Sequence, residues 1–291
     1  MTILNQENDG LYPELIVLAR AAFVAPHSAD DLVSICEIDN PKKLRAALSR
    51  WTTLGLFEIA DERVVIARSV VGNKREGVDA FTERLPHICR RLALLPIHCE
   101  PLWEDVGQSS DLARALAWLL AQDIHNLPST WKGGADNLVN EQVPGKSVFQ
   151  NDTRWNGARF WSRYLGFASG PSSDFVVDPT EAVRHELRAL FTPDEPVDAQ
   201  TFAEELARAI PVLDGGVYRR EMESCMDMSL WRPTASGQLS MSLSFALRRL
   251  QLEGTLVLEH RADTQQGLTL TGKGYVPTVT FSHVRVTGTS E

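Results

Sequence analysis

Two histidines and two cysteines in one short segment have side chains that bind transition metals: His87, Cys89, His98 and Cys99. Imidazole nitrogen and thiolate sulfur are common ligands of structural zinc. The long gap before the adjacent pair at 98–99 does not match the usual zinc-finger spacings. We therefore expect ordinary core and surface residues here, and we predict no metal and no cofactor. Whether the four side chains come together is left open by the sequence.

Motifs that signal catalysis are absent from the sequence. It contains no glycine-rich phosphate loop followed by Lys-Ser or Lys-Thr, no H-E-x-x-H zinc helix and no G-x-S-x-G nucleophile turn. The closest acidic pairs, at 30–31, 61–62 and 204–205, fall where helix starts, a hairpin tip and a solvated helix face are expected. We predict no catalytic residue and a protein that is not an enzyme.

Basic side chains recur where a nucleic-acid-binding protein would need them. Neutralising DNA phosphates requires Lys and Arg on an exposed helix or strand. The candidate DNA-binding residues are Lys42, Lys43, Arg45, Arg50, Arg63, Arg159, Arg163 and Arg248. The alternative interpretation is that they lie on solvated helix faces and pair with the surplus of Asp and Glu.

A helix, a glycine and a β-rich run follow one another at both ends of the chain, in residues 44–59 and 243–258. Apolar residues repeat in both at i, i+4 and i+7, as expected for a helix with one buried face. Gly55 and Gly254 then allow a positive φ that ends each helix. Residues 155–168 have the same design, with Gly166 in the equivalent place. This order is typical of the last helix and the hairpin of a winged-helix domain.

Three modules follow from these segments, so we predict a mainly α fold with small β-hairpins (α+β) and tandem winged-helix modules. Residues 1–70 form an N-terminal winged-helix domain. Residues 71–191 form a mainly helical middle domain, with loops over 127–150 and a degenerate winged helix over 151–191. Residues 192–291 form a C-terminal winged-helix-like domain, in which strand 255–259 pairs with strand 267–271 around a polar tip at 262–266 and residues 278–286 add an edge strand.

The overall composition is that of a globular protein with an acidic surface. The 291 residues carry a formal net charge of −9 and are 43% hydrophobic. No apolar stretch approaches the roughly 18 residues needed to cross a bilayer, and the first residues lack the pattern of a signal peptide. We expect a cytoplasmic protein without a membrane partner. The acidic total weakens, without excluding, the DNA-binding hypothesis.

Four short segments resemble a known family. They are residues 3–5 (ILN), 9–13 (DGLYP), 161–168 (WSRYLGFA) and 178–180 (DPT). The chain resembles the G component of the bacterial Dpd gene clusters, which place 7-deazaguanine bases in DNA and restrict unmodified DNA. The resemblance spans nearly the full length and implies a role in phage or plasmid defence within a multi-protein system. It implies no catalytic residues.

Two functional hypotheses result. The first is a non-catalytic winged-helix component of an anti-phage restriction system that binds double-stranded DNA through its basic helices. The second is a docking adaptor that assembles the other protein subunits of a defence complex without contacting DNA. The acidic charge and the aromatic residues of 155–167 favour the second hypothesis. The oligomeric state and any preference for DNA sequence or modification are left open.

Overall fold

The structure is a computed structural model that describes residues 2–4, 12–36, 40–72, 76–104, 106–171, 175–261 and 267–288. Helices dominate, and the strands form small antiparallel pairs and one three-stranded sheet. This confirms the predicted mainly α class with small β elements. The winged-helix assignment of the modules stays a prediction.

The N-terminal module contains three helices and then a hairpin, the order that the sequence predicts. Its elements are α1 (Tyr12–Val24), α2 (Ala29–Ile35), α3 (Pro41–Thr53), β1 (Phe57–Ala60) and β2 (Arg63–Ile66). Two caps fix the helix starts, as expected from the residue types. The side chain of Ser28 accepts a hydrogen bond from the backbone N–H of Asp31, and the side chain of Asn40 accepts one from the backbone N–H of Lys42. Both hydrogen bonds are 3.1 Å long. Pro41 then occupies the first turn of α3.

The middle of the chain is built around one buried helix. Its elements are α4 (Val78–Ala93), α5 (Pro96–Cys99), α6 (Ser110–Leu120), η1 (Trp131–Ala135), α7 (Asp136–Gln142), α8 (Asp152–Tyr164), β3 (Ala168–Ser169), β4 (Val176–Val177) and α9 (Thr180–Leu190). Every residue of α6 is buried. The expectation of loops over 127–150 is wrong for 131–142, which is helical. Gly133 and Gly134 interrupt the helical pattern of the sequence, so this helix was not predicted. Gln142 at the end of the helix accepts a hydrogen bond from the indole N–H of Trp118, and this contact holds the helix against α6.

The C-terminal module pairs its strands differently from the sequence prediction. Its elements are β5 (Pro196–Asp198), α10 (Ala199–Ala209), α11 (Val217–Glu223), α12 (Met241–Leu252), β6 (Leu256–Glu259), β7 (Leu268–Gly272), η2 (Lys273–Tyr275), β8 (Val276–Phe281) and β9 (His283–Val286). The predicted pairing of β6 with β7 is wrong, because β7 pairs with β8 and β6 pairs with β9. The single edge strand expected over 278–286 is also wrong: this segment is divided between β8 and β9, and β9 is the central strand of the sheet β5-β9-β6. The expected tip at 262–266 lies outside the described residues.

Burial and a tight turn explain this pairing. Val284 and Val286 of β9 are 1% and 3% exposed, so the position of β9 in the sheet removes their apolar side chains from water, which favours this pairing. Gly274, with a φ of 70°, lets the chain reverse between β7 and β8. The hairpin therefore consists of β7 and β8, whereas the spacing of apolar residues predicted a hairpin of β6 and β7.

The three glycines that end the repeated helices adopt the left-handed conformation. Gly55, Gly166 and Gly254 have φ values of 86°, 84° and 73°. Each follows a helix, α3, α8 or α12, and precedes a strand. The predicted helix-to-strand junctions at Gly55 and Gly254 are confirmed.

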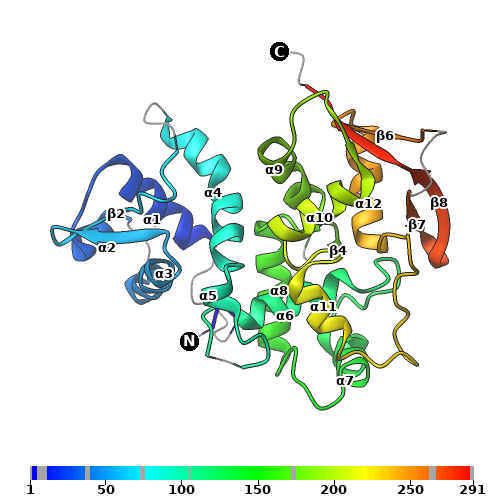
Figure 1. The fold of residues 1–291 in the computed structure, drawn as a ribbon. Coiled ribbons are helices and arrows are strands. Elements are labelled where there is room, and N and C mark those ends of the chain that lie inside the picture. Colours follow the sequence, from blue (N-terminus) through cyan, green and yellow to red (C-terminus); the bar gives the residue numbers. More distant parts are fainter. Residues whose placement is uncertain are drawn as a thin grey trace.

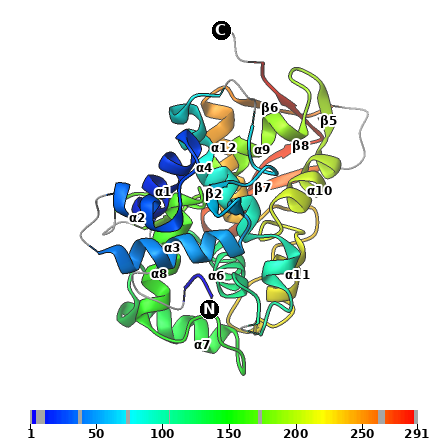
Figure 2. The same ribbon diagram turned by 90° about the vertical axis from the view of Figure 1, so that its left-hand side faces the viewer.

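The N-terminal module packs against the middle of the chain through aromatic rings. Figure 1 shows α1, α2, α3 and the hairpin on the left and α9 to α12 with the later strands on the right; Figure 2 turns the left side toward the viewer. Tyr12 of α1 stacks on Phe160 of α8 with ring centroids 4.4 Å apart. Trp51 of α3 lies 5.7 Å from Trp161 of α8. These contacts fix the position of α3 relative to α8.

Candidate nucleic-acid interface

The first turn of α3 presents basic side chains because the helix buries its opposite face. Leu44, Leu48 and Trp51 are buried in the module, which leaves Lys42 and Arg45 exposed and Lys43 partly exposed. Neither lysine forms an ion pair with any residue that the structure describes. The Nη1 atom of Arg45 lies 2.6 Å from Oδ1 of Asp30 at the start of α2, so part of its charge is already compensated.

Arg63 adds an exposed cation from the hairpin. It precedes Val64, whose backbone N–H donates a 2.8 Å hydrogen bond to the carbonyl of His27, just before α2. The start of α2 is therefore the point where α3, through Arg45, and β2 meet. Asp61 and Glu62 occupy the exposed hairpin tip, so the hairpin carries both signs of charge. Lys42, Lys43, Arg45 and Arg63 are called the α3 basic face below.

Arg50 does not belong to this face. Its side chain is only 7% exposed, although the sequence placed it among the cations available to DNA. The last turns of α3 lie close to α8, as the contact of Trp51 with Trp161 shows. A second part of the chain therefore covers the end of the helix that carries Arg50.

The cations of α8 lie against an aromatic ring rather than in open solvent. The guanidinium groups of Arg159 and Arg163 lie 5.2 and 5.4 Å from the ring centroid of Phe175. Arg163 also donates a 2.6 Å hydrogen bond to the carbonyl of Pro171. Burial, and next the charge of Arg163, lower the pKa of Arg159. Trp155 and Trp161 are 0% and 2% exposed, so the tryptophans of α8 belong to the core and not to a stacking or docking surface.

Arg248 is the remaining candidate. Its side chain is exposed on α12 and donates a 2.7 Å hydrogen bond to Oε1 of Gln251. Figure 1 shows α12 on the opposite side of the molecule from α3. The structure therefore brings Lys42, Lys43, Arg45 and Arg63 into one module and leaves Arg248 on another.

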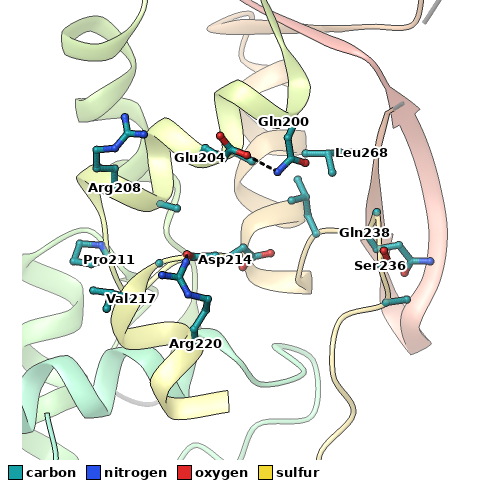
Figure 3. A pocket seen from close by; sticks show the side chains of 17 residues that line it. Gln200, Glu204, Arg208, Pro211, Asp214, Val217, Arg220, Ser236, Gln238 and Leu268 are labelled. Carbon is teal, nitrogen blue, oxygen red and sulfur yellow. Dashed lines mark hydrogen bonds between the residues drawn. The ribbon is translucent and has the colours of Figure 1, made fainter. Parts of the chain in front are cut away.

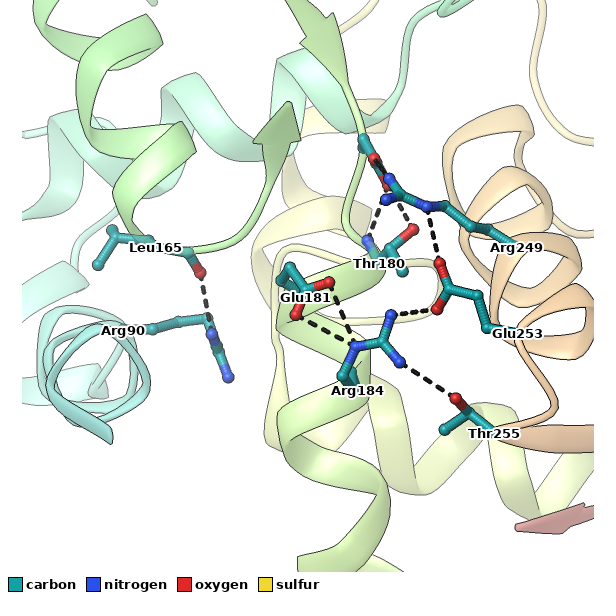
Figure 4. A network of polar contacts seen from close by, with 9 residues as sticks. Arg90, Leu165, Thr180, Glu181, Arg184, Arg249, Glu253 and Thr255 are labelled. Carbon is teal, nitrogen blue, oxygen red and sulfur yellow. Dashed lines mark hydrogen bonds and ion pairs between the residues drawn. The ribbon is translucent and has the colours of Figure 1, made fainter. Parts of the chain in front are cut away.

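The neighbouring residue on α12, Arg249, belongs to an ion-pair network (Figure 4). Arg249 bridges the buried carboxylate of Asp178, at 2.5 Å, and Glu253, at 3.1 Å. Glu253 also pairs with Arg184 of α9. Charges that could have attracted a phosphate therefore hold the middle and C-terminal modules together.

A buried cluster that sequence reasoning missed joins α4, α8 and α9. The Nη1 atom of Arg90 donates a 2.9 Å hydrogen bond to the carbonyl of Leu165, and its Nη2 atom lies 3.3 Å from Oε1 of Glu186. The same Glu186 oxygen lies 3.3 Å from Nδ1 of His87, whose ring stacks on His185. Arg90 and Glu186 are separated by 96 positions in the sequence, so no local sequence signal predicts this pairing.

The possible zinc ligands have separate partners. His87 belongs to the cluster around Glu186, while the thiol of Cys99 donates to the carbonyl of Ala93 over 3.1 Å. Burial raises the pKa of Cys89 well above its usual value and that of Cys99 to about 11, so both thiols stay protonated at neutral pH. Within the described ranges, no group of three or more His, Cys, Asp or Glu side chains is arranged to hold a metal ion.

Comparison with protein families identifies the chain. A family model described as DpdG-like matches residues 1–264. The chain belongs to the DpdG-like family. No curated protein matches its sequence, and no solved structure matches its fold.

This DpdG-like chain has a cleft between α10, α11 and residues 235–239 (Figure 3). Its volume is about 710 Å³. Each of its four charged side chains already has a partner in the protein. These pairs are Glu204 with Gln200, Asp214 with Ser240, Arg208 with Glu205, and Arg220 with the carbonyl of Gly215. The charged side chains that line this cleft are therefore all held by other groups of the protein.

Among the residues with described positions, no helix has both the length and the apolar character that a membrane span requires.

Proposed function

We propose that this chain is a non-catalytic component of a Dpd restriction system and that it binds double-stranded DNA through the α3 basic face. The family match supports the link to the Dpd clusters. The observation that carries the DNA-binding proposal is that Lys42 and Arg45 are exposed and Lys43 is partly exposed on the first turns of α3. Arg63 is a further exposed cation on the hairpin of the same module. A protein that contacts bacterial DNA works in the cytoplasm, and we propose that location.

The element order of the module supports this mode of binding. A helix that follows two others and precedes a hairpin is the one that winged-helix and helix-turn-helix proteins insert into the major groove, with its N-terminal residues nearest the bases. Lys42 and Lys43 lie in the first turn of α3. Asp30, Asp61 and Glu62 lie near this face, so we expect modest affinity that falls steeply with salt.

Fluorescence anisotropy with a labelled duplex tests this function. The purified chain is titrated at increasing ionic strength, with single-stranded DNA of the same sequence as comparison. We expect binding to the duplex at low salt and a steep, linear loss of log affinity with log salt concentration. Absence of binding at the lowest ionic strength would remove DNA binding as an activity of the isolated chain.

A protein-docking adaptor is the second candidate function. It is favoured by the net charge of −9 and by the internal pairing of several arginines, including Arg184 and Arg249. Purification of the tagged chain from its native host at native expression levels, followed by mass spectrometry, tests it. We expect a stoichiometric partner subunit; elution of the chain alone would contradict the adaptor function.

A further inference from the structure

One cation of the α3 basic face is held by a carboxylate. The Nη1 atom of Arg45 lies 2.6 Å from Oδ1 of Asp30, which belongs to the first turn of α2. Helix α2 lies beside α3 in the N-terminal module (Figure 2). Both side chains reach the surface, with 56% of Arg45 and 80% of Asp30 exposed. The ion pair therefore favours one direction of a guanidinium that stays open to a ligand.

The other edge of this guanidinium is available. Within the part of the chain that the structure describes, Nε and Nη2 of Arg45 have no hydrogen-bond partner. The N–H groups of these two atoms point the same way, so together they fit two neighbouring acceptors. Arg84 uses the same edge inside the protein, where Nε and Nη2 donate to the two carboxylate oxygens of Glu76 over 2.5 and 2.6 Å. Arg45 therefore offers an unused two-donor edge.

The neighbours of Arg45 on α3 leave room for a duplex. Ala46 is partly exposed and Ser49, one turn further along the helix, is exposed. Lys42 lies three residues before Arg45 on the same side and is also exposed. The major groove admits an α-helix, and short side chains beside a long one let the long one reach the bases. The middle of α3 therefore suits contact with base edges through Arg45.

The carboxylate of Asp30 decides between a phosphate and a base as the partner of Arg45. A phosphate on this guanidinium would bring a second anion close to Asp30, and the two negative charges would repel each other. The edge of a base carries no net charge. Guanine presents two adjacent acceptors in the major groove, O6 and N7, whereas adenine presents an acceptor beside a donor. Two parallel donors next to a carboxylate therefore favour guanine.

We propose that Arg45 recognises guanine in the major groove, donating from Nε and Nη2 to O6 and N7 of the base, and that Asp30 is the positioning residue that directs its guanidinium. Arg45 then makes no phosphate contact, and its pair with Asp30 persists in the complex. The inference rests on the proposed DNA-binding function and names the base that the α3 basic face recognises.

The base preference of the full chain is measured first. Duplexes that the purified chain binds are selected from a randomised library and sequenced. We expect guanine to be enriched at one or more positions of the bound sequences. Anisotropy then compares a selected duplex with the same duplex in which that G·C pair is replaced by A·T. The replacement should weaken binding at least about tenfold.

The variant Arg45→Lys tests the two-donor edge. Lysine keeps the charge but lacks the planar pair of donors. The affinity ratio between the two duplexes should therefore fall at least about fivefold, while the slope of log affinity against log salt concentration stays the same. Arg68→Lys is the matched control, because Arg68 follows the hairpin of the same module and its side chain is 95% exposed outside the α3 basic face. This control should keep the parental ratio.

The variant Asp30→Asn tests the positioning residue. Without the carboxylate, the guanidinium loses its preferred direction and the duplex loses a repulsive charge. We therefore expect higher affinity for both duplexes together with a smaller ratio between them, a combination that the loss of a purely structural contact does not produce. The matched control Asp61→Asn makes the same change of charge at the exposed hairpin tip and should leave the ratio unchanged.

The outcomes separate the inference from the proposed function. Absence of duplex binding at the lowest ionic strength removes the DNA-binding function and the inference with it. Duplex binding without a guanine preference, or a preference that survives Arg45→Lys, overturns the inference alone. An equal loss of affinity for both duplexes in Arg45→Lys would assign Arg45 to a phosphate and also overturn it.

Discussion

Charge reversal of both lysines in the first turn of α3 is the sharpest test of the α3 basic face. The variant Lys42→Glu, Lys43→Glu removes two of the four candidate phosphate contacts. An ion pair in a high-dielectric environment contributes about 1 kcal/mol at 4 Å. Loss of two such contacts, about 2 kcal/mol, corresponds to a loss of affinity of about 30-fold at low salt.

The salt dependence gives a second, independent magnitude. Each neutralised phosphate contributes about −0.9 to the slope of log affinity against log salt concentration. Four contacts predict a slope of about −3.6, and three predict about −2.7 if the pair of Arg45 with Asp30 persists in the complex. Removal of Lys42 and Lys43 should bring the slope to between about −0.9 and −1.8.

The assay is anisotropy of a labelled duplex over a range of salt concentrations. The matched control is Lys132→Glu with Lys273→Glu, which makes the same change in net charge at two exposed lysines outside α3. We expect the control to keep nearly the parental slope. Equal slopes for the α3 variant and the parent chain, or equal losses for the α3 variant and the control, would refute a specific role of α3. Circular dichroism confirms that each variant folds.

Three other predictions concern stability and catalysis. Gly254→Ala should lower the free energy of unfolding by about 1 kcal/mol, because Gly254 has a positive φ. Gly166→Ala should lower it by more, because the added Cβ would also lie 2.8 Å from the backbone nitrogen of Ala182. Urea denaturation measures both losses of stability, and equal losses would contradict the reasoning. Burial opposes ionisation of Glu186, but His87 and Arg90 lower its pKa below the usual 4.5. The stabilisation by the ionised carboxylate is therefore present above pH 4.5 and is lost as the pH falls through the lower pKa of the folded state. The stability difference between the parent chain and Glu186→Gln should shrink in acid, and a difference that grows would contradict this prediction. Plasmid DNA incubated with the chain and Mg²⁺ or Mn²⁺ should stay intact, whereas cleavage that survives repurification and is lost on changing a carboxylate of this chain would show that it is an enzyme.

Local elements were predictable because their signals lie within a few residues. A polar cap at Ser28 or Asn40, an apolar stripe and a terminal glycine fix where a helix begins and ends. The three positive φ values at the repeated glycines follow from such signals. Helix 131–142 escaped prediction because Gly133 and Gly134 interrupt its pattern, while its stabilising contact reaches back to Trp118.

Strand pairing and buried ion pairs could not be predicted, because they depend on residues that are far apart in the sequence. Strand β9 enters the sheet between β5 and β6, so its partners come from segments far apart in the sequence. The pairing of Arg90 with Glu186 also depends on how α4 and α9 pack. The sequence of α3 does not show which other parts of the chain pack against the helix, and so Arg50 was predicted to be an available cation although it is only 7% exposed.

The helix–glycine–strand segment occurs three times, and each copy packs into the core. Only the copy that contains α3 also presents a candidate DNA-binding surface. On α3 the outward lysines, Lys42 and Lys43, form no ion pair with described residues. On α8 the guanidinium groups of Arg159 and Arg163 lie over Phe175, and on α12 Arg249 is held by Asp178 and Glu253. The same local pattern therefore gives different surfaces, because each surface depends on what the rest of the chain packs beside it. A count of the basic residues along the repeats therefore overestimates the candidate surface for DNA, and the proposed contact with the duplex is limited to the N-terminal module.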